Sequence, residues 1–302
     1  MVKPWRSARV AVVVALVVAL CWSTSAGAEP SVRTELVRIK TEDGISLTGL
    51  LYQPQQSGIR AGMVMVHGYG GNFYTDVMSF LPQLLAARGI AALAINMRDH
   101  DLGPKGDRFE ESRLGIAAAV NDMARRGIRP LFLYGHSMGT NRVLYYMAAT
   151  HDPRVAGAVL TGPPGNLFAW NVRVFGREAA SRVLIEAQDL VAAGRGDQWM
   201  VVDLGPLGKA LYTANHVVSL RGPLSLSDPF RNIAQVTRPI LIVHGLADRL
   251  VDPAVADELR RNAPAPDQVT VVLIPGAEHS FRDHGKPLEE AVWTWLLRRL
   301  SP

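Results

Sequence analysis

Continuous apolar runs alternate along the chain with segments of helical character. The runs AGMVMV, IAALAI, LFLY, VAGAVL and PILIV have the composition of strands buried on both faces, because helices cover both sides of a parallel sheet. Helices are predicted at 73–89, 108–127, 177–194, 253–263 and 287–300, and after Met138. This alternation predicts an α/β fold with a mostly parallel central sheet flanked by helices.

Smaller signals refine this pattern. SVRTELVRIK and ISLTGLLYQP flank Asp43-Gly44 and predict two strands joined by a tight turn. Gly89 and Gly127 mark the expected ends of the first two helices. Pro82 stands inside the segment 73–89 and interrupts its helical pattern.

The alternation breaks between Pro164 and Arg238. A crossover between parallel strands needs about a dozen residues, and this stretch is far longer. We interpret the surplus, about 165–237, as a cap inserted over the carboxyl edge of the sheet, where ligands bind in open α/β folds. Trp170 and Trp199 in the cap are candidates for substrate binding, and packing of the cap onto the core is the alternative role.

The first 28 residues have the composition of a secretory signal peptide. Three cations precede the apolar run 10–20, and small residues at Ala26 and Ala28 form an A-x-A cleavage site. The run is shorter than the roughly 20 residues of a membrane span. We therefore expect export to the periplasm or the medium, with cleavage after Ala28. An uncleaved anchor, or a lipoprotein attached at Cys21, is the alternative.

Removal of this leader changes the charge and the thiol content. Formal net charge falls from +5 to +2, because the leader holds three cations and no acid. So small a charge argues against a nucleic-acid partner, which requires a concentrated basic face. Cys21 is the only cysteine, so the mature chain would have no disulfide, no thiol nucleophile and no thiolate metal site.

The stretch GHSMG places Ser137 between glycines two positions away on each side. A predicted strand precedes it and a predicted helix follows, which is the context of a nucleophile elbow. The glycines permit a strand to turn into a helix in very little space, and the helix N-terminus offers N–H groups to a negative charge. Ser137 is therefore the candidate nucleophile. A tight turn with an uninvolved serine is the alternative.

A serine nucleophile needs a base, and the base needs an acid to orient it. In enzymes with this turn the chain order is serine, acid, histidine. Asp248 in VHGLADRLVD and His279 in IPGAEHSF each follow a predicted strand, so both are expected at the same sheet edge as Ser137. Asp252 and His284 are the alternative acid and base.

The glycine-rich loop MVHGYGG ends an early strand at that edge. Such a loop can turn the N–H of Tyr69 toward the site, opposite the N–H of Met138, and two such donors form an oxyanion hole. Structural roles are expected for His67 and His244, which precede glycines at strand ends.

Together these segments resemble the α/β-hydrolase superfamily and its esterases and lipases. The resemblance rests on the loop at His67-Gly68, the elbow at Ser137, and the acid and base loops HGLAD and AEHSF. In the cap, IEAQDLVAAGRGD resembles a poorly characterised group that includes fungal siderophore esterases. The resemblance implies the α/β-hydrolase fold, a Ser-His-Asp triad and ester hydrolysis through an acyl-enzyme. Alternatives are a peptidase or amidase with the same triad and a non-catalytic binding protein on the same fold.

No cofactor or metal is expected. No GxGxxG follows the first strand, and neither HExxH nor paired Cys/His spacing occurs. Asp99, His100 and Asp101 cluster in MRDHDLG, where we expect a polar loop and a metal site is the alternative. The expected partner is a small ester or peptide-like substrate, with no nucleic acid and no membrane span after processing.

Overall fold

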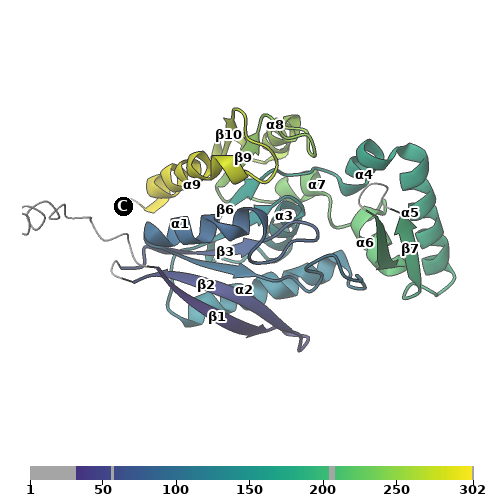
Figure 1. Cartoon of the computed structure of the whole chain (residues 1–302), viewed down its shortest axis with the longest axis horizontal. Helices are drawn as coiled ribbons and strands as arrows, with labels where there is room; N and C mark the ends of the chain where they lie inside the picture. The colour runs from purple at the N-terminus through teal and green to yellow at the C-terminus, as the bar shows by residue number, and fades with distance from the viewer. Residues whose placement is uncertain (1–31, 56–57, 204–207, 301–302) are drawn as a thin grey trace, which may run out of the picture.

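The computed structural model describes residues 32–55, 58–203 and 208–300. The leader predicted at 1–28, with Cys21, lies outside the described residues. Within them, eight strands form the main sheet in the order β1-β2-β4-β3-β5-β6-β9-β10 (Figure 1). Their bounds are β1 Val32–Lys40, β2 Ser46–Pro54, β3 Ala61–Val66, β4 Ile90–Ile95, β5 Leu131–His136, β6 Val155–Thr161, β9 Ile240–Gly245 and β10 Val269–Ile274.

The pairing of these strands confirms a mostly parallel sheet. From β4 to β10 every neighbouring pair runs parallel, whereas β1 and β2 form an antiparallel hairpin that joins the edge of β4. The predicted turn at Asp43-Gly44 connects β1 to β2. Gly44 has a φ of +86° there, a conformation that glycine adopts without steric cost.

Helices cover both faces of the sheet, which is why its central strands are apolar throughout. On β3, Met63 and Met65 point into one hydrophobic cluster, while Val64 and Val66 point into the other. The first cluster contains α1 Leu81–Ala87 and α9 Gly285–Leu300. The second contains α2 Ser112–Arg125, α3 Met138–Thr150 and α8 Ala254–Asn262.

The helix predicted at 73–89 is shorter than the pattern indicated. A single 3-10 turn at Asp76–Ser79 precedes α1, and Pro82 lies in the first turn of α1. Proline fits there because the first N–H groups of a helix have no partner within the helix. Pro82 therefore stands at the beginning of a helix and does not interrupt one.

The segment predicted to form a cap, about 165–237, holds more regular structure than the one helix that the sequence pattern indicates. A group of three helices lies with a two-stranded antiparallel sheet beyond the end of the main sheet (Figure 1). These elements are α4 Leu167–Phe175, α5 Arg177–Ala192, β7 Trp199–Asp203, β8 Lys209–Thr213 and α6 Ala214–Arg221. They share a hydrophobic cluster of their own.

The last cap helix, α7 Pro229–Ile233, belongs by its contacts to the core. Ile233 is buried in the same cluster as α3 and α8. The chain therefore enters the cap after β6 and rejoins the core at α7. The helices α4, α5 and α6 lie at the carboxyl edge of the sheet. In the described part of the chain, no helix is long and apolar enough to cross a membrane.

Candidate active site

Ser137 occupies a strained position between β5 and α3. Its φ of 51° and ψ of −126° are unusual for a residue with a side chain. A Cβ on Gly135 would lie 2.5 Å from the carbonyl oxygen of Gly139, and a Cβ on Gly139 would overlap the carbonyl oxygen of Val66. Both glycines are therefore required by close packing, as the GHSMG pattern predicts for a strand that turns directly into a helix.

The strand order places the predicted acid and base on the same side of Ser137. Ser137 follows β5, and the next strands across the sheet are β6, β9 and β10. Asp248 follows β9 and His279 follows β10. His279 must therefore reach across β9 and β6 to approach Ser137.

Gly162, at the end of β6, leaves the space for this approach. A Cβ at this position would lie 3.1 Å from two atoms of the His279 ring and 3.8 Å from Asp248 Oδ2. Its φ of +54° also favours glycine. Gly162 was not among the residues predicted for the site, although its place after an apolar strand in VAGAVLTGPP is a signal for a residue at this edge.

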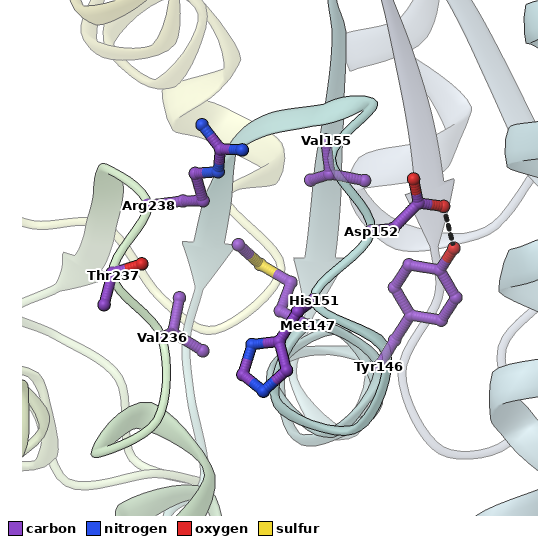
Figure 2. Close-up of a pocket in the computed structure, with 8 residues that line it drawn as sticks. All are labelled: Tyr146, Met147, His151, Asp152, Val155, Val236, Thr237 and Arg238. Atoms are coloured by element: carbon purple, nitrogen blue, oxygen red, sulfur yellow. Dashed lines mark hydrogen bonds between the residues drawn. The ribbon is translucent and has the colours of Figure 1, made fainter.

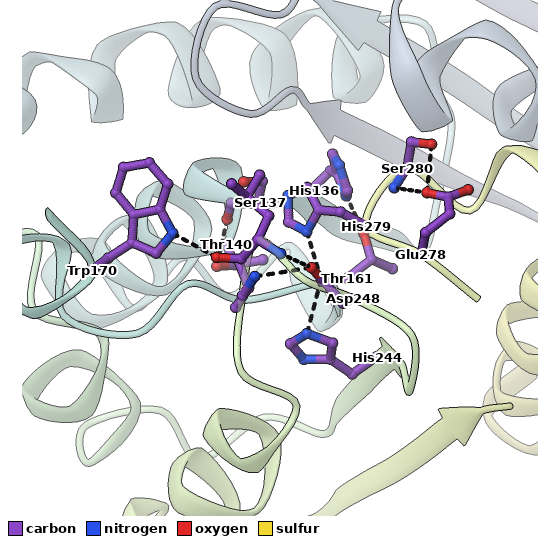
Figure 3. Close-up of polar contacts among 12 residues, drawn as sticks. His136, Ser137, Thr140, Thr161, Trp170, His244, Asp248, Glu278, His279 and Ser280 are labelled. Atoms are coloured by element: carbon purple, nitrogen blue, oxygen red, sulfur yellow. Dashed lines mark hydrogen bonds and ion pairs between the residues drawn. The ribbon is translucent and has the colours of Figure 1, made fainter. Parts of the chain in front are cut away.

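Asp248 is buried and accepts four hydrogen bonds. Its Oδ2 accepts from His279 Nδ1 at 2.7 Å and from His244 Nε2 at 3.1 Å, while Oδ1 accepts from the N–H groups of Leu250 and Val251 at 2.9 Å each (Figure 3). Burial alone would raise the pKa of Asp248, but the two histidine hydrogen bonds hold it well below its usual range. Asp248 is therefore a carboxylate that fixes the His279 ring.

The alternative acid and base stand elsewhere. Asp252 Oδ1 accepts from the N–H of Ala254 at 3.0 Å at the start of α8, and its side chain is exposed near Arg173. His284 lies beside Gly276, and among the described residues no carboxylate bonds to it. Of the two histidines considered as a base, His279 is the one with a carboxylate on its Nδ1.

His136 and Thr161 form the wall behind His279. The rings of His136 and His279 lie 5.0 Å apart, and His136 Nδ1 is 3.1 Å from the Thr161 hydroxyl. Burial, with His279 close by, lowers the pKa of His136 well below its usual value, so His136 is neutral. Figure 3 shows Ser137 in this same cluster. Within the described residues, the Ser137 hydroxyl makes no hydrogen bond, so it is free to turn toward a substrate or toward His279.

His67 holds the glycine-rich loop in place. Its Nε2 accepts from the N–H of Met97 at 3.0 Å, so its Nδ1 carries the proton and donates to the carbonyl of Gly68 at 2.7 Å. Burial lowers the pKa of His67 to about 4, which keeps the ring neutral. A structural role is what the sequence pattern predicts for this histidine.

The loop after β3 passes directly beside the candidate nucleophile. A Cβ on Gly68 would lie 2.9 Å from Ser137 Cβ, so a side chain there would displace the serine. In the described structure the N–H of Tyr69 has no hydrogen-bond partner, and the N–H of Met138 is the first of α3, where intrahelical partners are lacking. The two N–H groups predicted to form an oxyanion hole thus belong to the residues that follow Gly68 and Ser137, and neither has a hydrogen-bond partner among the described residues.

The side chain of Tyr69 connects this loop to the cap, a contact that the sequence does not indicate. Its hydroxyl hydrogen-bonds to the hydroxyl of Tyr212 on β8. The Lys105 ammonium lies 5.4 Å from the centre of the Tyr69 ring. The backbone of Lys105 also bonds to β8, donating to Leu211 and accepting from Thr213 at 3.0 Å each. The cap is thus joined to the loop that carries one candidate oxyanion donor.

The two tryptophans proposed to bind substrate have different surroundings. Trp170, on α4, donates from its indole Nε1 to the carbonyl of Leu250 at 3.1 Å and so touches the loop that carries Asp248. Trp199 begins β7, is 48% exposed and packs near Gly106. Trp170 is the one of the two that the structure places beside the predicted acid.

The acidic cluster after β4 is occupied by internal contacts. Asp99 is buried and pairs with Arg142, while Asp101 accepts from Asn72 Nδ2 at 2.7 Å and lies 2.6 Å from His100 Nδ1. Across the described ranges, no group of three or more His, Cys, Asp or Glu side chains is arranged to hold a metal ion.

A roomy hollow lies at the opposite edge of the sheet. It has a volume of about 260 Å³ and is lined by residues between the end of α3 and the starts of β6 and β9, among them Met147, His151 and Arg238 (Figure 2). None of the site residues predicted from the sequence lines it. Ligands of open α/β folds bind at the carboxyl ends of strands, so this hollow is not the candidate active site.

Comparison with known proteins places the chain in a family. A model of the alpha/beta hydrolase family matches residues 63–291, which is most of the chain. The chain therefore belongs to the alpha/beta hydrolase family, and the fold predicted from the sequence is confirmed. The chain is a hydrolase, as are the two curated relatives described next.

Two curated relatives match over most of their length. The chain is 24% identical over 263 residues to a monoglyceride lipase of Saccharomyces cerevisiae, covering 77% of this chain and 82% of the relative. It is 24% identical over 267 residues to a monoacylglycerol lipase of Mycolicibacterium smegmatis, covering 80% of this chain and 89% of the relative.

Solved structures share the fold at lower identity. Est1E from Butyrivibrio proteoclasticus has a TM-score of 0.64 at 19% identity, covering 88% of this chain and 99% of that chain. The alpha/beta hydrolase GrgF from a Penicillium species has a TM-score of 0.68 at 15% identity, covering 89% of this chain and 98% of that chain.

Proposed function

We propose that the protein hydrolyses carboxylic esters through Ser137, His279 and Asp248. The observation that carries this proposal is the 2.7 Å hydrogen bond from His279 Nδ1 to a buried carboxylate, beside a serine on a strained strand-to-helix turn. Because a carboxylate oxygen can only accept, Nδ1 of His279 is the donor of this hydrogen bond, and Nε2 is the nitrogen that can take up the serine proton. That is the protonation state required of a histidine that activates a serine hydroxyl.

The reaction follows from this arrangement. Ser137 Oγ attacks the ester carbonyl while its proton passes to His279 Nε2, and the carbonyl oxygen becomes an oxyanion that accepts from the N–H groups of Tyr69 and Met138. The tetrahedral intermediate collapses, His279 protonates the departing alcohol, and an acyl group remains on Ser137. Water, deprotonated by His279, then releases the acid. Asp248 stays ionised throughout and stabilises the imidazolium.

The choice of ester over amide as the substrate rests on the relatives. Both curated relatives are named as lipases of monoacylglycerols, and Est1E is described in complex with ferulic acid. The first two names imply cleavage of a carboxylic ester. The alcohol of an ester is also a better leaving group than the amine of an amide. Its departure therefore depends less on protonation by His279.

The test compares Ser137→Ala with Ser79→Ala on purified protein. Ser79 lies on an exposed turn, where its hydroxyl bonds to a neighbouring carbonyl, and its loss should leave activity unchanged. Ser137→Ala should abolish turnover of p-nitrophenyl butyrate and labelling by a fluorophosphonate, with an unchanged circular dichroism spectrum. Near-normal turnover by folded Ser137→Ala would falsify the mechanism. Faster cleavage of matched anilides than of esters would favour an amidase.

We also propose that the mature protein is exported and begins at Glu29. The cationic start, short apolar run and A-x-A site of residues 1–28 support this proposal. Mass analysis of the protein recovered outside the cytoplasm should give a chain that starts at Glu29. A chain that keeps Met1, or that carries a lipid on Cys21, would contradict it.

A further inference from the structure

Arg221, the last residue of α6, is a buried cation with unused hydrogen-bond donors. Its Nε and Nη1 are buried and have no hydrogen-bond partner in the described structure. One face of the guanidinium lies over the ring of Tyr212, with 5.9 Å between Cζ and the ring centre. Burial lowers the pKa of Arg221, which reflects the cost of holding this charge away from water.

No carboxylate among the described residues offsets this charge. Asp99, a buried acid on the core side of Tyr212, is already paired with Arg142. Buried charges in proteins are normally paired, because an isolated ion loses its hydration without compensation. Arg221 is therefore a cationic site that an anion from outside the described chain would complete.

Arg221 lines a narrow, partly open cavity between elements of the cap. The cavity has a volume of about 20 Å³ and is lined mainly by apolar side chains of α4, α5, β7, β8 and α6, including Phe175, Val183 and Val217. Asn171 also lines it, is 9% exposed, and has a buried Oδ1 without a partner in the described structure. Two polar groups that lack partners thus face one small apolar space, which suits a single small polar group on an otherwise apolar ligand.

The cavity adjoins the candidate active site. Leu220, next to Arg221, packs in one cluster with Met138, whose N–H is a candidate oxyanion donor. Tyr69, which carries the other donor, contacts the same cluster, and its hydroxyl bonds to Tyr212. Tyr212 lines the cavity and lies under the guanidinium. Tyr69 and Tyr212 therefore connect the surroundings of Met138 to the cavity that Arg221 lines.

We propose that Arg221 binds a carboxylate carried by the substrate, so that the preferred substrates are esters with a free carboxylate at some distance from the scissile bond. This inference rests on the proposed function, since it assigns the substrate class of the same site. A guanidinium with unused N–H groups is the side chain best suited to a carboxylate. The small volume requires α4 or α5 to move outward slightly as the carboxylate enters.

The experiment measures kcat/KM on matched pairs of esters. One series consists of p-nitrophenyl half-esters of dicarboxylic acids from succinate to suberate, and each has a neutral partner in which an isopropyl group replaces the carboxylate. A second series places the carboxylate on the alcohol side. The variants are Arg221→Met, which removes the charge at similar volume, and Arg221→Lys, which keeps it. Arg182→Met, on the exposed face of α5, is the matched control.

The wild type and Arg182→Met should prefer the carboxylate member of at least one pair by about 10- to 100-fold, the size expected for hydrogen bonds to a charged group. Arg221→Met should lose this preference, so that it hydrolyses the two members of each pair at similar rates, and Arg221→Lys should keep part of it. Equal turnover of both members by the wild type, or a preference that survives in Arg221→Met, would overturn the assignment of Arg221.

A binding measurement separates this inference from the proposed chemistry. Glutarate at millimolar concentration should raise the melting temperature of the wild type and of Ser137→Ala, but not that of Arg221→Met. The neutral diamide of glutaric acid should have no effect on any of them. Stabilisation by glutarate with no turnover of any ester would support the Arg221 site and refute the catalytic proposal. If no dicarboxylate stabilises the protein and only neutral esters are hydrolysed, the catalytic proposal is supported and the Arg221 site is refuted.

Discussion

Tyr69 and Tyr212 are 143 positions apart in the sequence, and their hydroxyl groups form a hydrogen bond across the boundary between the sheet and the cap. Tyr69 belongs to the loop after β3, and we propose its backbone N–H as an oxyanion donor. Tyr212 belongs to β8. Lys105 supports both partners, because its ammonium lies over the Tyr69 ring and its backbone bonds to β8. We therefore infer that the position of the cap and that of the proposed oxyanion donor are coupled.

Tyr212→Phe should weaken catalysis more than substrate binding. Loss of this partly buried hydrogen bond should lower the free energy of unfolding by about 1 kcal/mol. It should also lower kcat, because the loop that carries the Tyr69 N–H becomes less well ordered, while KM changes little. Urea titration and kinetics on p-nitrophenyl butyrate measure the two effects. Tyr74→Phe, at an exposed position, is the control and should change neither. An unchanged kcat in Tyr212→Phe would contradict the coupling.

Gly162→Ala should damage the active site specifically. The added Cβ would lie 3.1 Å from the His279 ring, closer than ordinary van der Waals contact, and should displace the imidazole from Ser137. Gly194→Ala is the matched control, since Gly194 also has a positive φ, +71°, but a Cβ there would meet nothing within 4 Å. Both variants should lose roughly 1 kcal/mol of stability from backbone strain. Only Gly162→Ala should lose kcat, and equal activity of the two variants would show that His279 tolerates the contact.

The sheet could be predicted from the sequence because its signals are local. Strands buried on both faces are almost entirely apolar, and the glycines on either side of Ser137 form a recognisable five-residue pattern, although Gly139 packs against the distant backbone of Val66. The pairing of Asp248 with His279 followed from chain order and from the strands that precede them. Their pairing is present in the structure, whereas their catalytic roles remain predictions.

The inner structure of the cap could not be predicted in the same way. β7 and β8 have mixed burial and pair only with each other, so their residues carry no long apolar run. The contact of Tyr69 with Tyr212, and the position of Arg221 over Tyr212, depend on how the cap packs on the core. The role of Gly162 depends on the reach of His279 across two strands. Such long-range geometry leaves no periodic trace in a single sequence.

Asp248→Asn should lower the rate sharply while Asp252→Asn has little effect. An asparagine at 248 can still accept from the N–H groups of Leu250 and Val251, but its amide NH₂ then faces His279 Nδ1 and favours the tautomer with the proton on Nε2. That tautomer cannot accept the serine proton, and the loss of kcat should approach the roughly 10⁴-fold known for serine proteases. KM should change little. A larger loss in Asp252→Asn than in Asp248→Asn would reassign the acid.

Acid should destabilise the fold through histidines that are buried in their neutral form. Burial lowers the pKa of His216 from 6.5 to about 4, and the ring is held by a 2.7 Å hydrogen bond from Nδ1 to the carbonyl of Asp107. The unfolded chain binds a proton near pH 6.5 and the folded chain does not, so the stability from this group is complete above about pH 6.5 and is lost progressively toward pH 4. The carboxyl of Asp107, whose pKa burial raises to about 6, acts in the opposite direction over much of this range.

His216→Gln isolates this contribution. The glutamine amide can donate to the same carbonyl but does not titrate, so the variant should lose about 2 kcal/mol less free energy of unfolding than the wild type between pH 7.5 and pH 5. Asp107→Asn should have the reverse effect and steepen the loss in acid. Urea titrations at pH 7.5, 6 and 5 measure both slopes, and comparing slopes removes any change in stability at neutral pH. If the free energy of unfolding falls with pH equally in the wild type and in His216→Gln, His216 must gain its proton in the folded state. Its burial between Tyr212 and the 99–109 loop should prevent this.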